Sequence, residues 1–201
     1  MNMLTIYLLR HGQTAWNADN NRYCGRTDIP LTAKGIGQAE EVKRQLEGIH
    51  FEKVYSSPLQ RAFDTACIAS GREVVKDDRL IEADFGAWET KTKEEFISEN
   101  RLLWLNWMED PAVHRAGGTG ETGTEIVARV DAFFRSLQQA FPEGNIMVVG
   151  HNGINRLYLA SKLGMPLKNY RQLVQQNSSV TSFTLDEDGT LTLQLLNSKL
   201  R

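Results

Sequence analysis

The sequence predicts an α/β fold, a three-layer α/β/α sandwich built around a mostly parallel sheet. Segments typical of β-strands alternate with segments typical of amphipathic helices through most of the 201 residues, which is the pattern of a parallel sheet covered on both faces. The last part of the chain instead resembles a hairpin with its turn at Asp188 and Gly189, which predicts an antiparallel addition at the sheet edge. No repeat or linker divides the chain, so we expect one domain over residues 1–201.

The expected strands are short and rich in apolar, β-branched or aromatic residues. The first is Leu4–Leu9, and the next is in FEKVYSS (51–57). The segment 73–88 mixes a short strand with a loop, NIMVVG (145–150) is a second strongly apolar strand, and 178–197 forms the hairpin. Two of these strands end in the same way, with histidine and glycine directly after the apolar run.

The expected helices show apolar residues at helical spacing. They cover 31–48, 58–71, 92–110, 124–141 and 154–164. Pro58 suits a first helical turn, and Gly48 and Gly71 suit helix ends. Val127, Val130, Phe134 and Leu137 share one side of their helix, and the glycine-rich segment 114–123 is expected to be a loop.

Composition limits the kinds of partner and the compartment. With 23 basic and 25 acidic residues the net charge is −2, so bulk charge favours neither nucleic acid nor an anionic membrane surface. No segment is apolar and long enough to span a bilayer, and the start lacks the pattern of a signal peptide. Cys24 and Cys67 have no metal-ligand spacing, so we expect two free thiols in a cytoplasmic protein.

Chemically active side chains follow several of the expected strands. The first strand ends in Arg10, His11 and Gly12, and the helix after the second strand begins with Arg61 in its first turn. Glu82 lies in the segment LIEADFG, and His151 follows the strand 145–150. Because active residues in such sheets gather beyond the carboxyl ends of the strands, we expect these side chains to converge.

Two arginines, two histidines and one glutamate suit phosphoryl transfer. Arginine forks bind phosphate oxygens and stay charged, and helix N-termini near Gly12 and Gly153 would add amide donors. A histidine can shuttle a proton or attack phosphorus, and Glu82 could protonate the leaving group and then activate water.

Two other site types are less well supported by the sequence. Two histidines and a glutamate could bind a metal, but Arg10 directly precedes His11, and neither histidine belongs to an HExxH or HxH motif. A serine hydrolase would use Ser56 or Ser57 with His151, but the chain has no GxSxG elbow.

The motifs resemble those of the histidine phosphatase superfamily, also called phosphoglycerate mutase-like. LLRHGQTAWN carries the RHG signature, and further matches in the family's order occur in GRTDIPLTAKGIGQA, VYSSPLQRAFDTA, LIEADFGAWE, GGTGET and VVGHNGINR. The resemblance runs from residue 4 to about residue 156 and implies the fold predicted above.

The resemblance also implies roles for individual residues. His11 would become a phosphohistidine, with its other ring nitrogen donating to a nearby backbone carbonyl. Arg10, Arg61 and His151 would hold the phosphoryl oxygens, Asn17 would contact the phosphoryl group, and Glu82 would transfer protons. Gly12 would let the backbone come close to the ligand, Gln13 in the same loop would contact the substrate, and Thr14 would orient the loop. No metal and no other cofactor is implied.

The substrate is less well determined, because departures from the family pattern border the substrate pocket. They are Thr90, Gly117-Gly118 and Thr122. We expect the substrate rim to include Tyr23, Cys24, Gly25, Arg26, His114, Glu121 and Asn152. Trp104 and Trp107 could line an aromatic pocket, but their helical spacing favours core packing.

Chain length and the DFGAWE string resemble α-ribazole phosphatases, so α-ribazole 5′-phosphate is one candidate substrate. The NRYCGRTD segment keeps a phosphoglycerate mutase open, although the ERHYG segment of mutases is absent. A pseudo-phosphatase that only binds a phosphorylated partner would be expected to lack His11 or Glu82. We expect a small-molecule phosphate ester as the partner, no nucleic acid or membrane, and a monomer or homodimer.

Overall fold

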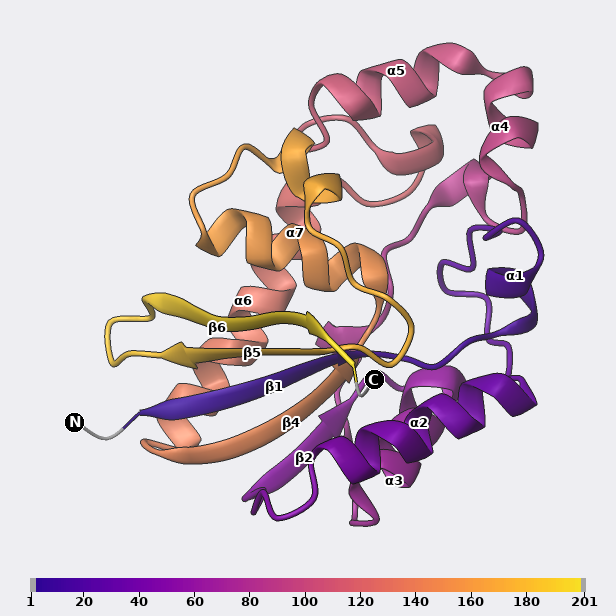
Figure 1. Ribbon diagram of the computed structural model, residues 1–201. Helices are drawn as coiled ribbons and strands as arrows, with labels where there is room; N and C mark the ends of the chain where they lie inside the picture. The colour runs from indigo at the N-terminus through magenta and orange to yellow at the C-terminus, as the bar shows by residue number, and fades with distance from the viewer. Residues whose placement is uncertain (1–2, 200–201) are drawn as a thin grey trace.

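A six-stranded sheet between two layers of helices forms the centre of the protein (Figure 1). The computed structural model describes residues 3–199. The strand order is β3-β2-β4-β1-β5-β6, in which the first four strands are parallel and the last two antiparallel. The strands are β1 (Leu4–Arg10), β2 (Lys53–Ser56), β3 (Val75–Lys76), β4 (Gly144–Gly150), β5 (Val180–Leu185) and β6 (Leu191–Ser198). The predicted fold class is thus confirmed, including the antiparallel hairpin at the edge.

Helices cover both faces of the sheet. The α-helices are α1 (Ala15–Ala18), α2 (Ala33–Gln45), α3 (Gln60–Ser70), α4 (Lys93–Glu99), α5 (Arg101–Glu109), α6 (Gly123–Ala140) and α7 (Asn152–Lys162). Short 3₁₀ turns are η1 (Asp78–Leu80), η2 (Gly86–Trp88), η3 (Ala116–Gly118) and η4 (Leu167–Gln172). None of the described helices combines the length and the apolar character needed to cross a membrane.

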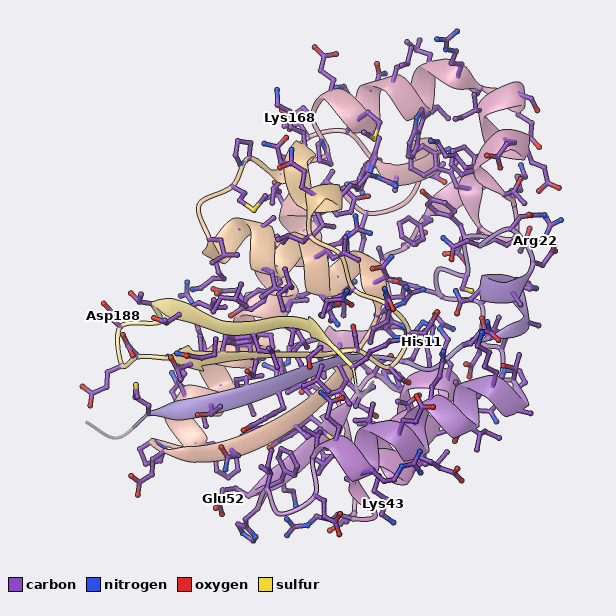
Figure 2. All side chains as sticks on the ribbon, in the orientation of Figure 1. His11, Arg22, Lys43, Glu52, Lys168 and Asp188 are labelled. Carbon is purple, nitrogen blue, oxygen red and sulfur yellow. The ribbon has the colours of Figure 1, made fainter. Side chains whose placement is uncertain are left out.

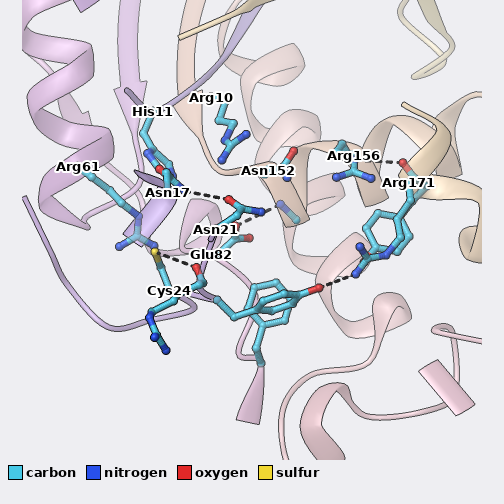
Figure 3. A pocket seen from close by; sticks show the side chains of 15 residues that line it. Arg10, His11, Asn17, Asn21, Cys24, Arg61, Glu82, Asn152, Arg156 and Arg171 are labelled. Carbon is cyan, nitrogen blue, oxygen red and sulfur yellow. Dashed lines mark hydrogen bonds between the residues drawn. The ribbon is translucent and has the colours of Figure 1, made fainter. Parts of the chain in front are cut away.

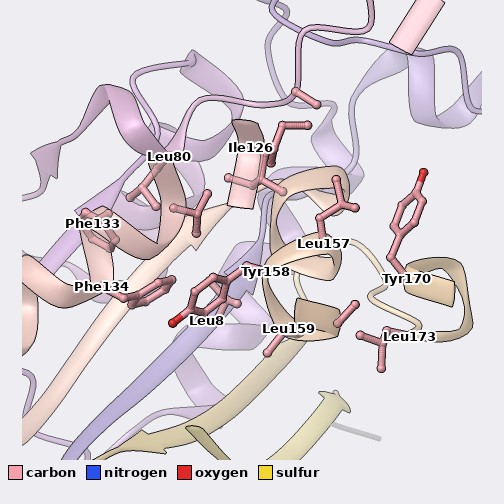
Figure 4. Close-up of a cluster of buried hydrophobic side chains, with 14 of the residues drawn as sticks. Leu8, Leu80, Ile126, Phe133, Phe134, Leu157, Tyr158, Leu159, Tyr170 and Leu173 are labelled. Atoms are coloured by element: carbon pink, nitrogen blue, oxygen red, sulfur yellow. The ribbon is translucent and has the colours of Figure 1, made fainter. Parts of the chain in front are cut away.

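The two faces of the sheet carry separate apolar clusters because strand side chains alternate. Ile146 and Val148 of β4 join the larger cluster with α6 and α7, part of which Figure 4 shows. Met147 and Val149 join the smaller cluster with α2 and α3. The central strands are therefore buried on both sides, which holds their ends rigidly.

The register of the two central strands brings the two histidines of the sequence motifs together. Arg10 of β1 pairs with Gly150 of β4, so His11 and His151 leave neighbouring parallel strands at the same level. The backbone N–H of His11 donates to the Gly150 carbonyl at 3.1 Å. The hairpin turn lies at the other end of the sheet, where Figure 2 labels Asp188 far from His11.

Two details of the predicted elements differ from the structure, and a third agrees with it. The helix expected over 92–110 is two helices, because Asn100 leaves the helical conformation at φ −153° and caps the second one. Pro58 lies outside α3, which begins at Gln60 after the extended Leu59. Gly71 does end that helix in the left-handed conformation, at φ +61°.

The glycine-rich segment is a loop with one 3₁₀ turn, and it packs tightly on the segment that follows Glu82. Gly117 has φ +59°, and a Cβ there would lie 2.2 Å from the Phe85 carbonyl oxygen. Only glycine allows this approach. Trp104 and Trp107 are buried with Trp88 and Phe96, so their predicted role in core packing is confirmed.

Candidate active site

A pocket opens beyond the carboxyl ends of the central strands, where His11 is labelled in Figure 3. Eight of the predicted site residues line it: Arg10, His11, Asn17, Tyr23, Cys24, Arg61, Glu82 and Asn152. They come from six separate stretches of the chain, and the sheet and its flanking helices bring them together, as the strand-end argument predicted.

His11 is held in one tautomer by its own loop. Its Nδ1 lies 2.7 Å from the Gly12 carbonyl oxygen, which can only accept, so Nδ1 carries the proton and Nε2 has a free lone pair. Burial and the charges of Arg61 and Arg10 hold the pKa of His11 well below its usual value. The ring is therefore neutral near pH 7, the form that can act as a nucleophile.

Arg10 and Arg61 are anchored by backbone carbonyls. Arg10 Nη1 donates to the Gln175 carbonyl at 2.9 Å, and Arg61 donates to the Thr27 and Gly25 carbonyls at 2.9 and 2.7 Å. Both Nε atoms are buried without a hydrogen-bond partner. Burial lowers the pKa of Arg10 to about 10, so it remains charged near pH 7. Two fixed cations with unused donors therefore face the His11 side of the pocket.

His151 lies beside His11 and is wholly buried. Their ring centroids are 5.1 Å apart, and neither ring nitrogen of His151 has a hydrogen-bond partner. Burial, Arg61 and His11 hold the pKa of His151 well below its usual value, so its ring is neutral. A buried imidazole without partners is costly for folding, which is a common mark of a binding group.

Glu82 sits at the N-terminus of α7. Its carboxylate accepts hydrogen bonds from the backbone N–H groups of Gly153 and Ile154, both at 3.2 Å, and of Ala83 at 2.9 Å. The backbone N–H of Gly153 was expected to donate to a bound phosphate, but it donates to Glu82 instead. A carboxylate of the chain itself occupies this helix N-terminus, where its charge is favourable.

Gly12 also differs from its expected role as a place of close approach to the ligand. A Cβ on Gly12 would lie 2.5 Å from the Gly35 carbonyl oxygen, so glycine is needed here for packing against α2. The Gly12 N–H donates to Thr65 Oγ1 at 2.9 Å. Its function is therefore to hold the His11 loop against the helical layer.

The loop after Gly12 shapes the near wall of the pocket. Asn17 Oδ1 accepts from the Thr14 N–H and from Asn177 Nδ2, both at 3.1 Å, which fixes the side chain. Cys24 lies near Arg61, and burial raises the pKa of its thiol. The hydroxyl of Tyr23 accepts a hydrogen bond from Arg171 Nη2 at 2.8 Å.

Several residues expected at the rim lie elsewhere. The pocket lining does not include Gly12, Gln13, Gly25, Arg26, His114 or Glu121. Glu121 forms an ion pair with Arg129 at 2.9 Å and accepts from the Asp84 N–H at 3.0 Å, so it supports the segment after Glu82. Arg26 lies 3.3 Å from Glu121, outside the pocket. None of these six residues therefore lines the pocket.

Three cationic lining residues, Arg22, Arg156 and Arg171, were missed by the sequence analysis. Arg156 is in the second turn of α7, four residues after Asn152 and on the same helical face, a spacing that could have revealed it. Arg171 is in η4, and no local pattern distinguishes it from other surface arginines. The other missed lining residues are Asn21, Phe85 and Tyr170, whereas Gly153, which was named for its amide, also lines the pocket.

Within residues 3–199, no three histidine, cysteine or acidic side chains form a cluster that could hold a metal ion. The charged and titratable side chains of the lining include Arg10, Arg61, His11 and Glu82. The arrangement can bind a dianion between Arg10 and Arg61 while a neutral His11 faces it.

Comparisons with known proteins agree with this arrangement. The Histidine phosphatase superfamily (branch 1) model matches residues 6–199. The structure of phosphoserine phosphatase from Entamoeba histolytica in complex with 3-phosphoglyceric acid is 30% identical, with a TM-score of 0.88 and 98% of both chains covered.

Two further relatives carry other activities in their names. The structure of α-ribazole phosphatase from Shigella flexneri is 30% identical, with a TM-score of 0.84 and 96% of each chain covered. The probable phosphoglycerate mutase GpmB of Escherichia coli is 33% identical over 92% of this chain and 86% of its own length. The three differ in activity at similar identity, so they do not select a substrate.

Proposed function

Because the chain belongs to the histidine phosphatase superfamily and is a phosphomonoesterase of that superfamily, we propose that it hydrolyses a small phosphate ester through a covalent intermediate on His11. One observation carries the proposal. His11 is buried and neutral, its Nδ1 is fixed on the Gly12 carbonyl, and it lines a pocket together with Arg10 and Arg61, with the His151 ring 5.1 Å from its own.

The phosphoryl group binds between the two anchored arginines. Their unused Nε donors reach its oxygens, with permanent charge that does not depend on pH near neutrality. A neutral His151 donates one ring N–H to a third oxygen, and Asn17 contributes its amide. These groups stabilise the charge that spreads over the phosphoryl oxygens in the transition state.

The reaction has two steps in which protons and electron pairs balance. His11 Nε2 attacks phosphorus, the bond from phosphorus to the alcohol oxygen breaks, and Glu82 gives its proton to that oxygen. Glu82 then takes a proton from water, the resulting hydroxide attacks phosphorus, and the bond to His11 breaks. Inorganic phosphate leaves and His11 is neutral again. Glu82 is assigned both transfers because no other carboxylate lines the described pocket.

Trapping the intermediate tests the proposal. The enzyme is mixed with a radiolabelled phosphate monoester, quenched in alkali, and digested to locate a label that acid removes. We expect the label on the peptide that contains His11 and a loss of at least about 10⁴-fold in kcat for His11→Ala. His50→Ala is the matched control, because His50 is exposed and far from the pocket.

Two results would overturn the proposal. One is a label on a residue other than His11, and the other is near-normal turnover by His11→Ala. Excess EDTA tests the expectation that no metal takes part, and we expect it to leave the rate unchanged.

Free Cys24 and Cys67 support a cytoplasmic protein, and we propose that residues 1–201 act as one domain.

A substrate panel separates phosphatase from mutase action. 3-Phosphoglycerate is offered with its bisphosphate activator, and the products are resolved as 2-phosphoglycerate or as glycerate and phosphate. We expect hydrolysis, because the chain lacks the mutase ERHYG segment. Preferential formation of 2-phosphoglycerate would establish the mutase alternative. α-Ribazole 5′-phosphate belongs in the same panel as a substrate with an uncharged alcohol.

A further inference from the structure

The Arg10 side chain is oriented by a single contact. Its Nη1 donates to the Gln175 carbonyl at 2.9 Å, and within residues 3–199 the guanidinium makes no other hydrogen bond. Arg61, by contrast, donates to two carbonyls. Figure 3 shows the Arg10 guanidinium directed into the pocket. Because this group is planar and its donors have fixed directions, the position of the Gln175 carbonyl sets where the unused donors of Arg10 point.

Gln175 lies in the connection between η4 and β5, where no helix or strand holds the backbone. Its side chain is nevertheless buried, at 3% exposed, whereas the preceding Val174 is 55% exposed and the following Gln176 is also exposed. A buried amide is costly unless its polar atoms are hydrogen-bonded. The partners of the Gln175 side chain therefore show what anchors this segment.

A chain of hydrogen bonds between buried side chains holds the Gln175 amide. Asn155 Nδ2 of α7 donates to the Leu9 carbonyl and to Gln175 Oε1, both at 3.1 Å. Since a carbonyl only accepts, Nδ2 is the donor end of the Asn155 amide, and Gln175 presents its oxygen to it. Gln175 Nε2 then donates to Thr181 Oγ1 of β5 at 3.1 Å. Both ends of the Gln175 amide have partners, which fixes its orientation.

This chain of hydrogen bonds holds both ends of the Arg10 side chain. Leu9 directly precedes Arg10 in β1, so the backbone from which the side chain begins is tied to the carbonyl that its guanidinium contacts. The pocket lining includes neither Asn155 nor Gln175. The segment also reaches the His11 carbonyl through Asn177 Nδ2, at 3.1 Å. An experiment must therefore separate the route through Arg10 from the route through His11.

We propose that Gln175 is a positioning residue for Arg10. Its amide, held between Asn155 and Thr181, fixes the carbonyl that directs the Arg10 guanidinium at the phosphoryl oxygens. Gln175 itself does not touch the substrate. This inference rests on the proposed function, because it takes Arg10 to bind the phosphoryl group.

Gln175→Met tests the proposal, because methionine has a similar length and lacks the amide. The dissociation constant of inorganic phosphate is measured by phosphorus NMR titration, since phosphate presents the oxygens that Arg10 binds. We expect phosphate to bind about 10-fold more weakly, and kcat/KM for p-nitrophenyl phosphate to fall by about the same factor. The dissociation constant describes the folded molecules alone, so a substitution that only lowers the folded fraction leaves it unchanged.

Two further variants control for the segment and for folding. Gln176→Met changes the exposed neighbour of Gln175 in the same connection, and we expect it to bind phosphate as the unmodified enzyme does. Thr181→Val keeps the shape of the side chain and removes the hydroxyl that accepts from Gln175, and we expect about 3-fold weaker binding. If Gln175→Met does not fold, Thr181→Val carries the same test.

Combination with Arg10→Gln shows which route is used. When the Arg10 guanidinium is already lost, we expect Gln175→Met or Thr181→Val to change phosphate binding by less than about 2-fold. Equal weakening with and without Arg10 would place the effect on His11 or on the fold and would overturn the inference. A phosphate affinity of Gln175→Met equal to that of Gln176→Met would also overturn it. An unmodified enzyme that releases phosphate from no ester would instead contradict the proposed function.

Discussion

The two ends of the pocket are built in different ways. At the phosphoryl end, Arg10, His11 and His151 follow directly from β1 and β4, whose side chains are buried on both faces of the sheet. At the other end, Arg156 and Arg171 come from α7 and η4 and are fixed by aromatic rings and single hydrogen bonds. The difference indicates that the sheet fixes the positions of Arg10, His11 and His151, whereas Arg156 and Arg171 depend on how α7 and η4 pack.

The largest expected effect that bears on this comparison comes from Arg61→Lys. Lysine keeps the charge but cannot reach the Thr27 and Gly25 carbonyls and the phosphoryl group together, as the Arg61 fork does. We expect kcat/KM to fall by about 10²- to 10³-fold for 3-phosphoglycerate and glycerol 3-phosphate alike. Steady-state phosphate release measures this, with Arg44→Lys on α2 as the exposed control. A loss confined to 3-phosphoglycerate would show that the two ends are not separate.

Glu82→Gln should produce the next largest effect, and one that depends on the leaving group. The amide keeps the shape but cannot give a proton to the alcohol oxygen, so we expect a loss of about 10²-fold in kcat for glycerol 3-phosphate. p-Nitrophenyl phosphate has a better leaving group, so formation of its phosphohistidine should suffer less, as a pre-steady-state burst of nitrophenol would show. Exposed Glu109→Gln serves as the control. An equal loss in the burst rates of both esters would argue that Glu82 is structural.

Arg129→Met tests whether the Glu82 segment needs support from outside the pocket. Arg129 Nη1 donates to the Arg79 and Ile81 carbonyls, both at 2.7 Å, and the guanidinium pairs with Glu121. We expect about a 10-fold loss in kcat with little change in KM, and a loss of about 1–3 kcal/mol in the free energy of unfolding. Urea denaturation and steady-state rates measure the two. Exposed Arg101→Met is the control, and unchanged kcat in a destabilised Arg129→Met would limit Arg129 to stability.

The same contrast between the two ends explains which residues of the pocket could be predicted from the sequence and which could not. Arg10 and His11 could be placed because a buried strand has a defined end, and the register of β1 with β4 then sets His151 beside them. Arg171 could not be placed, because its position depends on how η4 packs against Tyr23 and Trp104, which no local periodicity encodes. The expected free amides at Gly153 were wrong because Glu82, distant in sequence, binds them.

Glu121 and Gly12 show a related limit. Both occur in motifs of the superfamily, and both were expected to contact substrate. Glu121 instead pairs with Arg129, and Gly12 packs against Gly35. A sequence motif indicates which residues the site requires. It does not show whether such a residue contacts the ligand or supports other residues that contact the ligand.

The smallest expected effect is a dependence of stability on pH that arises at the phosphoryl end. His11 and His151 are buried as neutral rings with lowered pKa values, whereas in the unfolded chain they titrate near their ordinary pKa of about 6.5. Below that pH the unfolded state binds more protons, so the folded protein loses stability as pH falls from about 6.5 toward the folded pKa values. Each histidine contributes a slope of up to about 1.4 kcal/mol per pH unit.

Urea denaturation at several pH values between 7.5 and 5.5 measures this slope for the unmodified protein and for His151→Asn. We expect the slope to be smaller in His151→Asn, because one buried group no longer takes up a proton on unfolding. His50→Asn removes an exposed histidine and should keep the original slope. If His151→Asn and His50→Asn have the same slope, then water or a proton reaches His151 in the folded state. The phosphoryl end would then be less isolated from solvent than its burial indicates.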